Sequence, residues 1–257
     1  MQADPAALRL AQVGVRYPGR DTPAVTGVSF EVAAGGVTAI MGPSGAGKSS
    51  LLGAVNRLHD LVEGIRVEGR VEVGGMDVAA FDPNELRRQV GTILQRPLPF
   101  AGSIAHNVSF ALRCHGVPRS EIADRVEEAL TDAALWPEVR DRLSSEASAL
   151  SGGQQQRLCL ARALALRPRA VLLDEPCASL DPAATAKVEE SLRKIAGQTT
   201  ILLVTHNLAQ ARRLAQRVVA LWPGVQGGRC VAEGPTAAIF ADPPTPELRA
   251  WVSGAIG

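Results

Sequence analysis

The residues at 42–49 have the composition and spacing of a loop that holds phosphate. They read Gly42-Pro43-Ser44-Gly45-Ala46-Gly47-Lys48-Ser49, with Ser50 next, and fit the pattern G-x-x-x-x-G-K-[ST] at every specified position. Glycines let backbone N–H groups turn inward around an anion, and a helix that starts there adds the positive end of its dipole. We expect Lys48 to contact the β- and γ-phosphates of ATP and Ser49 to ligate Mg²⁺. The alternative is a plain glycine-rich turn, but the strand-like run 37–41 before it and the helix-compatible run 50–57 after it favour the phosphate loop.

A second candidate site follows the apolar run 170–173, which ends in Asp174 and Glu175. Mg²⁺ prefers oxygen ligands and keeps several waters, so one nearby carboxylate is the usual arrangement. We expect Asp174 to hold the metal and Glu175 to orient or deprotonate the attacking water. An apolar run followed by two acids can also be an ordinary strand end, and it is the phosphate loop that makes the functional interpretation the stronger one.

Two more polar residues end runs that resemble buried strands. Gln95 follows the run 90–94, and His206 follows the run 199–205. Such continuous apolar runs are typical of a parallel sheet that is covered on both faces. Because ligands of doubly wound sheets lie at the carboxyl ends of the strands, we expect both residues to lie beside the bound phosphate.

The segment 150–154 predicts a second helix start that could bind an anion. Its residues are Leu150, Ser151, Gly152, Gly153 and Gln154, and a helix is expected over 155–166. Ser151 is a common N-cap residue, and two glycines allow a ligand to approach the backbone. One arrangement that would use this start is a two-fold dimer, in which it completes the ATP site of the other subunit. The alternative is an ordinary capped helix.

These sites need an α/β framework. Alternating apolar residues predict strands near 8–17, 28–32 and 67–73, with turns at Pro18-Gly19 and Gly74-Gly75. The stretch 96–168 is mostly helix-like, so we interpret it as a helical lobe inserted into the core. One of its helices is expected to begin with Ser120 as the N-cap.

Composition places the chain among ordinary globular proteins. Of its 257 residues, 46% are hydrophobic and 21% charged, and the net charge of +1 gives no basic excess of the kind that nucleic-acid binders show. No apolar run approaches the length of a membrane span, and Met1–Pro5 has no signal-peptide character. The four scattered cysteines match no zinc spacing and are interpreted as small apolar residues in a reducing compartment.

In motif order and spacing the chain resembles the nucleotide-binding subunits of ABC transporters. Residues 42–49 match the Walker A loop, Gln95 the Q-loop, 150–154 the LSGGQ signature, 171–175 the Walker B strand, Ser179 to Asp181 the D-loop, His206 the switch histidine and Tyr17 the aromatic that stacks on adenine.

This resemblance implies one ABC ATPase domain over 1–257. Its P-loop NTPase core, with a mostly parallel sheet and an N-terminal antiparallel β subdomain, would comprise 1–95 and 169–257, and the helical subdomain 96–168. ATP and Mg²⁺ are the implied ligands, with Gln95 joining Ser49 and Asp174 at the metal, and with Glu175, His206 and Gln95 as the catalytic set. The implied partners are a second copy of the subunit, whose signature residues 151–154 act in trans, and two integral membrane permease subunits.

A narrower resemblance is to the ATPases of phosphate-specific (Pst) importers. It is carried by 56–58, 60–62, 66–69, 95–97, 99–100, 151–159, 174–177, 204–207 and 233–240. The segment 221–229 departs from that group. This resemblance implies phosphate uptake at the cytoplasmic face of the cell membrane, with an extracytoplasmic solute-binding protein as an indirect partner and no nucleic acid. One alternative is import of an amino acid or of another oxyanion such as molybdate. The other is a soluble ABC ATPase that acts in DNA repair or translation.

Overall fold

The computed structural model describes residues 7–255 and forms two compact units. The first unit holds the chain up to Arg87 and from Thr200 onward, and the second is Arg88–Thr199. The segment 1–5, considered above for signal-peptide character, lies outside the described residues. Within 7–255 no helix is long and apolar enough to cross a membrane. The expected helical segment 96–168 lies inside the second unit, and its boundaries stay a prediction.

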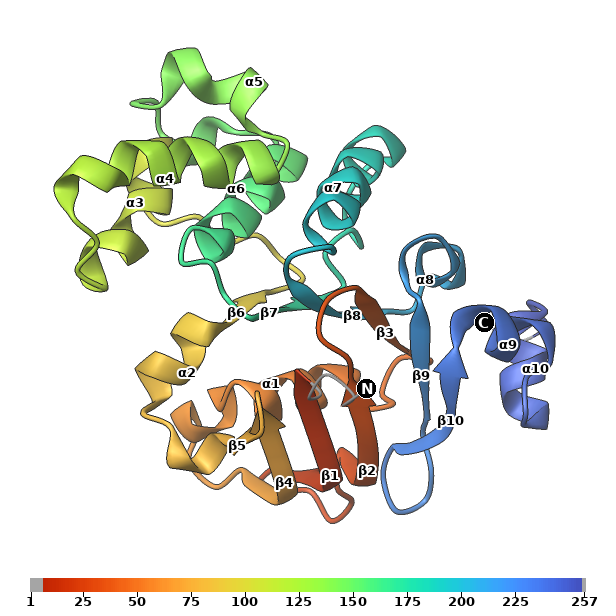
Figure 1. Ribbon diagram of the computed structural model, residues 1–257. Coiled ribbons are helices and arrows are strands. Elements are labelled where there is room, and N and C mark those ends of the chain that lie inside the picture. The colour runs from red at the N-terminus through yellow and green to blue at the C-terminus, as the bar shows by residue number, and fades with distance from the viewer. Residues whose placement is uncertain (1–6, 256–257) are drawn as a thin grey trace, which may run out of the picture. The chain divides into compact units, whose positions relative to one another are not determined.

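The first unit contains an antiparallel sheet with the strand order β2-β1-β4-β5 (Figure 1). Its strands are β1 (Leu8–Arg16), β2 (Val25–Val32), β4 (Arg66–Val73) and β5 (Met76–Asp77). The antiparallel β subdomain implied by the resemblance is therefore present.

Strand β1 carries an irregularity that its sequence requires. The buried side chains are Leu8, Leu10, Val13 and Val15, so the apolar positions change from even to odd numbers. A strand with period two can keep both halves on one face only if one residue is extra. Gln12 is that residue: it has a left-handed φ of 53°, and the pairing with β4 shifts between Ala11 and Gly14.

The rest of the first unit is the parallel part of the fold. Strand β3 (Val37–Met41) lies between β8 (Thr200–Thr205) and β9 (Arg217–Trp222), parallel to both, and β10 (Arg229–Pro235) pairs antiparallel with β9. Every residue of β3 and β8 is buried, as expected for strands covered on both faces. The helices of this unit are α1 (Lys48–Val55), η1 (Leu58–Leu61), η2 (Val78–Ala80), α8 (Leu208–Leu214), α9 (Thr236–Ala241) and α10 (Pro246–Val252), with α2 (Pro83–Gln89) at the boundary.

The second unit pairs two parallel strands with a group of helices. Its strands are β6 (Val90–Ile93) and β7 (Ala170–Asp174). Helices α3 (Ile104–Cys114), α4 (Arg119–Asp132) and α6 (Gly152–Leu164) pack on one another, and α5 (Trp136–Val139) and α7 (Pro182–Ile195) pack beside them (Figure 1). Short 3₁₀ helices η3 (Arg140–Arg142) and η4 (Ala147–Ala149) complete the unit. Together the units have the α/β fold that the motif order predicted.

Two local expectations are wrong. Helix α4 begins at Arg119 with Pro118 as its N-cap, so Ser120 lies inside the first turn and caps nothing. Proline has its φ fixed near the value that a helix entrance needs, which lets the helix start two residues earlier than a cap at Ser120 would allow. Among the cysteines Cys159 is buried, but Cys114 is exposed and is not apolar filler.

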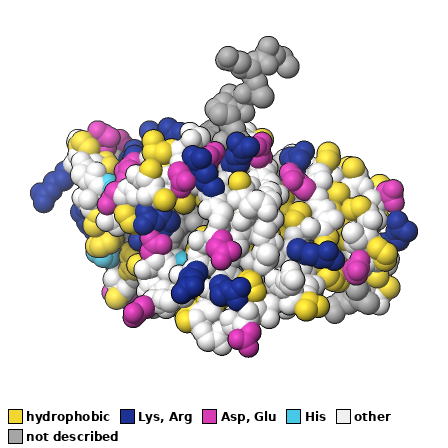
Figure 2. Space-filling model, turned by 90° about the horizontal axis from the view of Figure 1, so that it is seen from below, with side chains coloured by type: hydrophobic (Ala, Val, Ile, Leu, Met, Phe, Trp, Pro, Cys, Tyr) yellow, Lys and Arg dark blue, Asp and Glu magenta, His cyan; other side chains and the backbone are white. Residues whose placement is uncertain are grey.

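The charged side chains of the surface are mixed in sign. On the face shown in Figure 2, Lys and Arg side chains stand beside Asp and Glu side chains, among apolar and uncharged ones. Exposed ion pairs such as Arg9–Glu31 and Arg70–Glu72 are examples of this mixing. The arrangement agrees with the net charge of +1.

Candidate nucleotide-binding site

The loop predicted at 42–49 joins the end of β3 to the start of α1. Gly47 is the N-cap of α1, with a left-handed φ of 82°, and no side chain caps this helix start. A residue with a Cβ would be strained in that conformation. The N-cap residue therefore supplies no side-chain oxygen to the first backbone N–H groups of α1, as in helix starts that bind an anion.

Lys48 places a positive charge within this loop. Its side chain is buried, with 6% of the residue exposed, and Nζ donates hydrogen bonds to the carbonyl oxygens of Gly42 at 2.8 Å and Pro43 at 2.9 Å. An ammonium group is costly to bury without acceptors or an anion nearby, and the two carbonyls supply the acceptors here. The ammonium and the uncapped helix start together fit a polyphosphate chain.

The outer side of the loop is supported by the loop 223–228 between β9 and β10. A Cβ added to Gly228 would lie 2.1 Å from the carbonyl oxygen of Ala46, and one added to Gly42 would lie 2.2 Å from the carbonyl oxygen of Leu221. Gly228 is also anchored by its own backbone, because its N–H bonds to Ala24 and its carbonyl accepts from the N–H of Thr26. The backbones therefore touch, with no room for a side chain between them. This support lies in the segment 221–229 that departs from the Pst group.

Tyr17, predicted to stack on adenine, lies beside α1. Its hydroxyl is 3.1 Å from Oγ of Ser50, and its ring meets the ring of His59 edge to face at 5.7 Å. His59 is in turn fixed by a 2.8 Å hydrogen bond between Nε2 and the carbonyl oxygen of Ser50. His59 therefore orients Tyr17, a role that its sequence context did not indicate. The adenine contact stays a prediction.

His206 leaves the sheet next to the phosphate loop. Met41 at the end of β3 pairs with Thr205 at the end of β8, so Gly42 and His206 are the next residues on two neighbouring parallel strands. His206 is exposed, and Asn207 after it caps α8. The parallel sheet thus brings this sequence-predicted residue to the same edge as the loop.

In the second unit, the same principle brings Gln95 close to the two carboxylates. Ile93 of β6 pairs with Leu173 of β7, and two residues further along the two strands come Gln95 and Glu175. Asp174 closes β7 and is half-buried, while Gln95 is exposed. Glu175 has a left-handed φ of 47°, a conformation that costs energy for any residue with a Cβ. Such strain at a strand end is typical of positions where function sets the conformation.

The signature segment forms a complete capping box at the start of α6. Oγ of Ser151 accepts a hydrogen bond from the N–H of Gln154, and Oε1 of Gln154 accepts one from the N–H of Ser151 at 3.0 Å. The predicted N-cap is confirmed, although α6 starts at Gly152, three residues earlier than expected. Gly153 approaches α7 so closely that an added Cβ would lie 2.6 Å from Cβ of Ala184.

The D-loop residues lie at the start of α7, next to the Ala184 that Gly153 approaches. Oδ1 of Asp181 accepts a hydrogen bond from the N–H of Ala184 at 2.9 Å and so caps α7, and Ser179 is exposed before it. Asp181, predicted as a D-loop residue, therefore also stabilises the start of α7.

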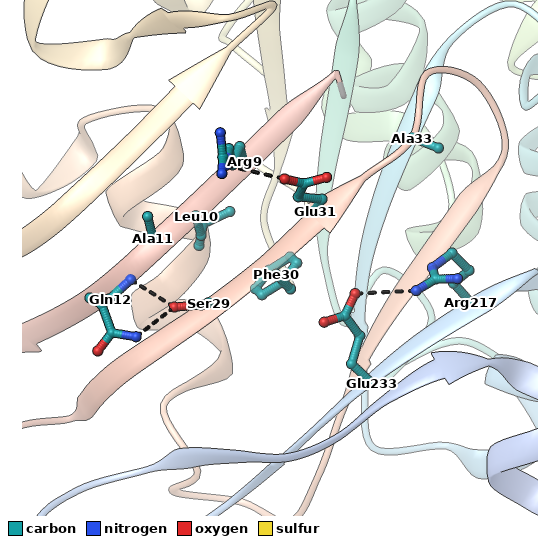
Figure 3. Close-up of a pocket in the computed structure, with 10 residues that line it drawn as sticks. All are labelled: Arg9, Leu10, Ala11, Gln12, Ser29, Phe30, Glu31, Ala33, Arg217 and Glu233. Carbon is teal, nitrogen blue, oxygen red and sulfur yellow. Dashed lines mark hydrogen bonds and ion pairs between the residues drawn. The ribbon is translucent and has the colours of Figure 1, made fainter. Parts of the chain in front are cut away.

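A groove on the first unit contains none of the predicted site residues. Its lining pairs Arg9 with Glu31 and Arg217 with Glu233, and Gln12 with Ser29 (Figure 3). Because its charges are matched within the groove, it offers no net charge to a nucleotide.

The fold and this loop define a P-loop protein that binds a nucleoside triphosphate. The family model described as "ABC transporter" matches residues 25–178. The chain belongs to the ABC transporter family, and it carries the ATP-binding domain of that family.

Two solved structures are similar over most or all of the chain. CbiO1 from Clostridium perfringens, part of the ABC transporter complex CbiONQ, shares 27% identity at a TM-score of 0.77, with 92% of this chain and 91% of that protein covered. A bacterial Atm1-family ABC exporter with ATP bound shares 26% identity at a TM-score of 0.79. That alignment covers 100% of this chain but 43% of the exporter chain.

Proposed function

We propose that this chain is the ATP-hydrolysing subunit of an ABC importer, with inorganic phosphate as the cargo. The observation that carries the ATPase is the buried Lys48 held in the loop at the uncapped start of α1. A transporter assembled from separate subunits is supported by CbiO1, a protein of similar extent that is part of a transporter complex. The phosphate cargo is supported by the Pst-like sequence segments.

In the proposed reaction, the residues that follow β3, β6, β7 and β8 each have a role. Lys48 and the backbone of the loop bind the β- and γ-phosphates, and the carboxylate of Glu175 takes a proton from the water that attacks the γ-phosphorus. The bond from the γ-phosphorus to the β–γ bridging oxygen breaks, so that ADP leaves with that oxygen and inorganic phosphate is formed. His206 holds the γ-phosphate, and Tyr17 holds the adenine. Mg²⁺ would be held by Ser49, Gln95 and Asp174, and it would neutralise charge on the phosphates.

The second copy of the subunit is supported by Gly152. A Cβ at this position would meet nothing within 4 Å in the described residues, and its φ lies outside the left-handed region, so the fold of the chain alone gives no reason for glycine. Glycine costs about 1 kcal/mol relative to alanine in a helix interior, which is an upper bound for Gly152 as the first residue of α6. A close approach by the ATP of a partner copy supplies that reason, as in the proposed head-to-tail dimer with Ser151 to Gln154 acting in trans.

The remaining partners follow from the proposed transporter. They are two integral membrane permease subunits and, indirectly, an extracytoplasmic solute-binding protein, and the chain would lie at the cytoplasmic face of the membrane. Transport by the reconstituted complex, compared for phosphate, molybdate and an amino acid, tests the cargo. Preference for either of the other solutes would replace phosphate.

The ATPase proposal is tested with Glu175→Gln. This variant should bind ATP but fail to activate water, so ATP should accumulate in a stable dimer visible by sedimentation velocity. Lys48→Ala in the same background is the control, because it should remove the ATP on which the dimer depends. ATP hydrolysis by Glu175→Gln at the parent rate would show that Glu175 is not the base.

A further inference from the structure

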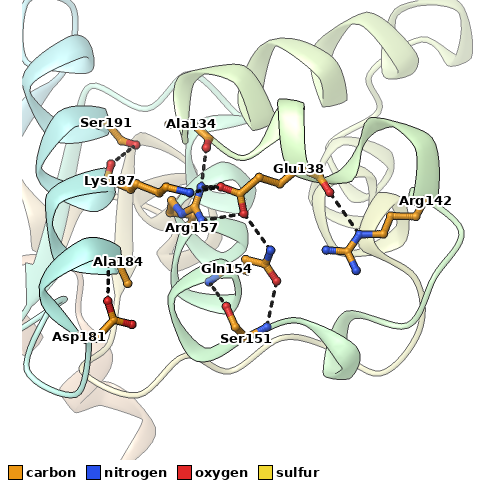
Figure 4. Close-up of polar contacts among 10 residues, drawn as sticks. All are labelled: Ala134, Glu138, Arg142, Ser151, Gln154, Arg157, Asp181, Ala184, Lys187 and Ser191. Atoms are coloured by element: carbon orange, nitrogen blue, oxygen red, sulfur yellow. Dashed lines mark hydrogen bonds and ion pairs between the residues drawn. The ribbon is translucent and has the colours of Figure 1, made fainter.

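Glu138 of α5 joins three helices at the signature segment. Its carboxylate accepts two hydrogen bonds from Arg157 of α6, at 3.0 and 3.1 Å, and one from Nζ of Lys187 of α7 at 2.7 Å. Nε2 of Gln154 donates a fourth bond at 2.8 Å. These side chains point toward one another from separate helices (Figure 4). No motif in the sequence indicated Glu138.

Arg157 makes this ion pair different from the exposed ones. Only 2% of the residue is exposed, and its guanidinium also bonds to the carbonyl oxygen of Ala134. Its Nε is buried without a hydrogen-bond partner in the structure. Because a buried guanidinium needs a counter-charge, the bidentate carboxylate of Glu138 sets where Arg157, and with it α6, can lie.

Gln154 connects the carboxylate of Glu138 to the signature residue Ser151. Its amide nitrogen bonds to Glu138 while its amide oxygen accepts from the N–H of Ser151. The bond to Glu138 requires the NH₂ end of the amide, so it leaves the oxygen end for the capping box. Glu138 thereby fixes the orientation of the cap that holds Ser151 and the first turn of α6.

Lys187 connects the carboxylate of Glu138 to α7. Gly153 of α6 touches Ala184 in the first turn of α7, next to the cap formed by Asp181. Lys187 is three residues after Ala184, on the same side of the helix, and it is bound to the same carboxylate as the start of α6. The starts of α6 and α7 are therefore held together by the close approach of Gly153 to Ala184 and by the carboxylate of Glu138.

We propose that Glu138 is a positioning residue for the site formed in trans. It aligns the signature residues Ser151 and Gly152 with the D-loop end at Asp181, so that a second copy of this chain meets both as one surface. Glu138 itself does not touch the nucleotide. This inference rests on the proposed function, because it requires that the signature segment closes the ATP site of a partner copy.

The charge state of Glu138 supports this role. The hydrogen bonds from Arg157 lower the pKa of Glu138 to about 2 against the effect of burial, with smaller contributions from Lys187 and Gln154. The carboxylate therefore stays ionised, and the network stays intact, throughout the neutral pH range.

The test uses the full chain with Glu175→Gln, which should form an ATP-dependent dimer. Adding Glu138→Gln should raise the protein concentration needed for half-dimerisation about tenfold, while the Kd of the monomer for ATP changes less than twofold. In the chain with Glu175 intact, kcat should fall and KM for ATP should hardly change. Glu138→Asp, which keeps the charge, should recover part of the loss. Glu128→Gln is the matched control, since it removes another ion-paired carboxylate of the second unit that bonds to Arg167.

A second variant keeps the test possible if Glu138→Gln does not fold. Glu138→Met combined with Arg157→Met removes the buried guanidinium together with its half-buried carboxylate partner and should fold, because apolar replacement of such a pair is often tolerated. It should still weaken dimerisation. Dimerisation equal to that of the Glu175→Gln parent in either folded variant would overturn the positioning role. Failure of the Glu175→Gln parent to dimerise would instead overturn the proposed function.

Discussion

The contact between Gly228 and the phosphate loop can be tested with Gly228→Ala. Gly228 does not have a left-handed φ, so alanine meets no backbone obstacle and the effect is steric alone. The added Cβ would lie 2.1 Å from the carbonyl oxygen of Ala46, 2.8 Å from its carbonyl carbon and 3.1 Å from the carbonyl oxygen of Ala24. Carbon and oxygen need about 3 Å, so either the loop 42–49 or the loop 223–228 must move by roughly 1 Å.

This displacement sets the expected size of the effect. Overpacking of this kind typically costs about 1–3 kcal/mol of stability. Because every 1.4 kcal/mol of binding free energy is a tenfold change in Kd, a cost of this size on the ATP-binding conformation of the loop should lower the affinity for ATP by roughly fivefold to a hundredfold. The Ala46 carbonyl belongs to the loop itself, so the movement acts directly on the N–H groups that would bind phosphate.

The assay is titration of the folded variant with a fluorescent ATP analogue, with circular dichroism to confirm folding. Val225→Ala is the matched control, because Val225 lies in the same loop and is 97% exposed. Its affinity should equal that of the parent. A folded Gly228→Ala chain that binds ATP within twofold of the parent would refute the reasoning, since the loop 223–228 would then yield without moving the phosphate loop.

Two further predictions concern the second unit. Gly152→Ala should raise the free energy of unfolding by up to about 1 kcal/mol, because alanine favours the helix and meets no neighbour among residues 7–255, yet it should weaken ATP-dependent dimerisation in the Glu175→Gln background. Dimerisation at the parent concentration, measured by sedimentation, would show that no partner atom approaches Gly152. The second prediction is a pH dependence. The pKa of Glu138 is lowered from 4.5 to about 2, so its contribution to stability is present above pH 4.5 and is lost as the pH falls toward 2. Urea unfolding at pH 6 and at pH 3 should show the parent losing on the order of 1 kcal/mol more than Glu138→Gln, because the loss of about 2 kcal/mol that the pKa values imply is reduced by the solvent that reaches this side chain. Parallel losses in the two proteins would argue against the ion pair with Arg157.

Local sequence identified the features that local chemistry determines. The pattern at 42–49 predicted a loop between a strand and a helix, which lies between β3 and α1, and the burial of 37–41 and 200–205 follows from uninterrupted apolar runs. Because parallel neighbours end at one edge, the placement of His206 next to the loop could also be predicted.

Contacts between distant segments could not be identified in this way. Gly228 lies more than 180 residues after Ala46, and nothing in the loop 223–228 indicates that its backbone would touch the phosphate loop. Glu138 follows a Trp-Pro pair in a four-residue helix, and its three partners are chosen by helix packing. Ser120 was assigned as a cap from its residue type, but the preceding Pro118 determined where the helix starts. The resemblance to Pst importers gives a cargo that no described residue of this chain can be expected to touch.

The left-handed backbone of Glu175 places the proposed base in conflict with the stability of the fold. At a φ of 47°, glycine or asparagine would be less strained than glutamate, so a chain optimised for thermal stability alone would lose this carboxylate. Directed evolution that screens only for heat resistance or expression level should therefore drift toward inactive chains at this position. A glutamate that persists there marks a protein selected for turnover, and stabilisation of this ATPase has to be sought at other positions.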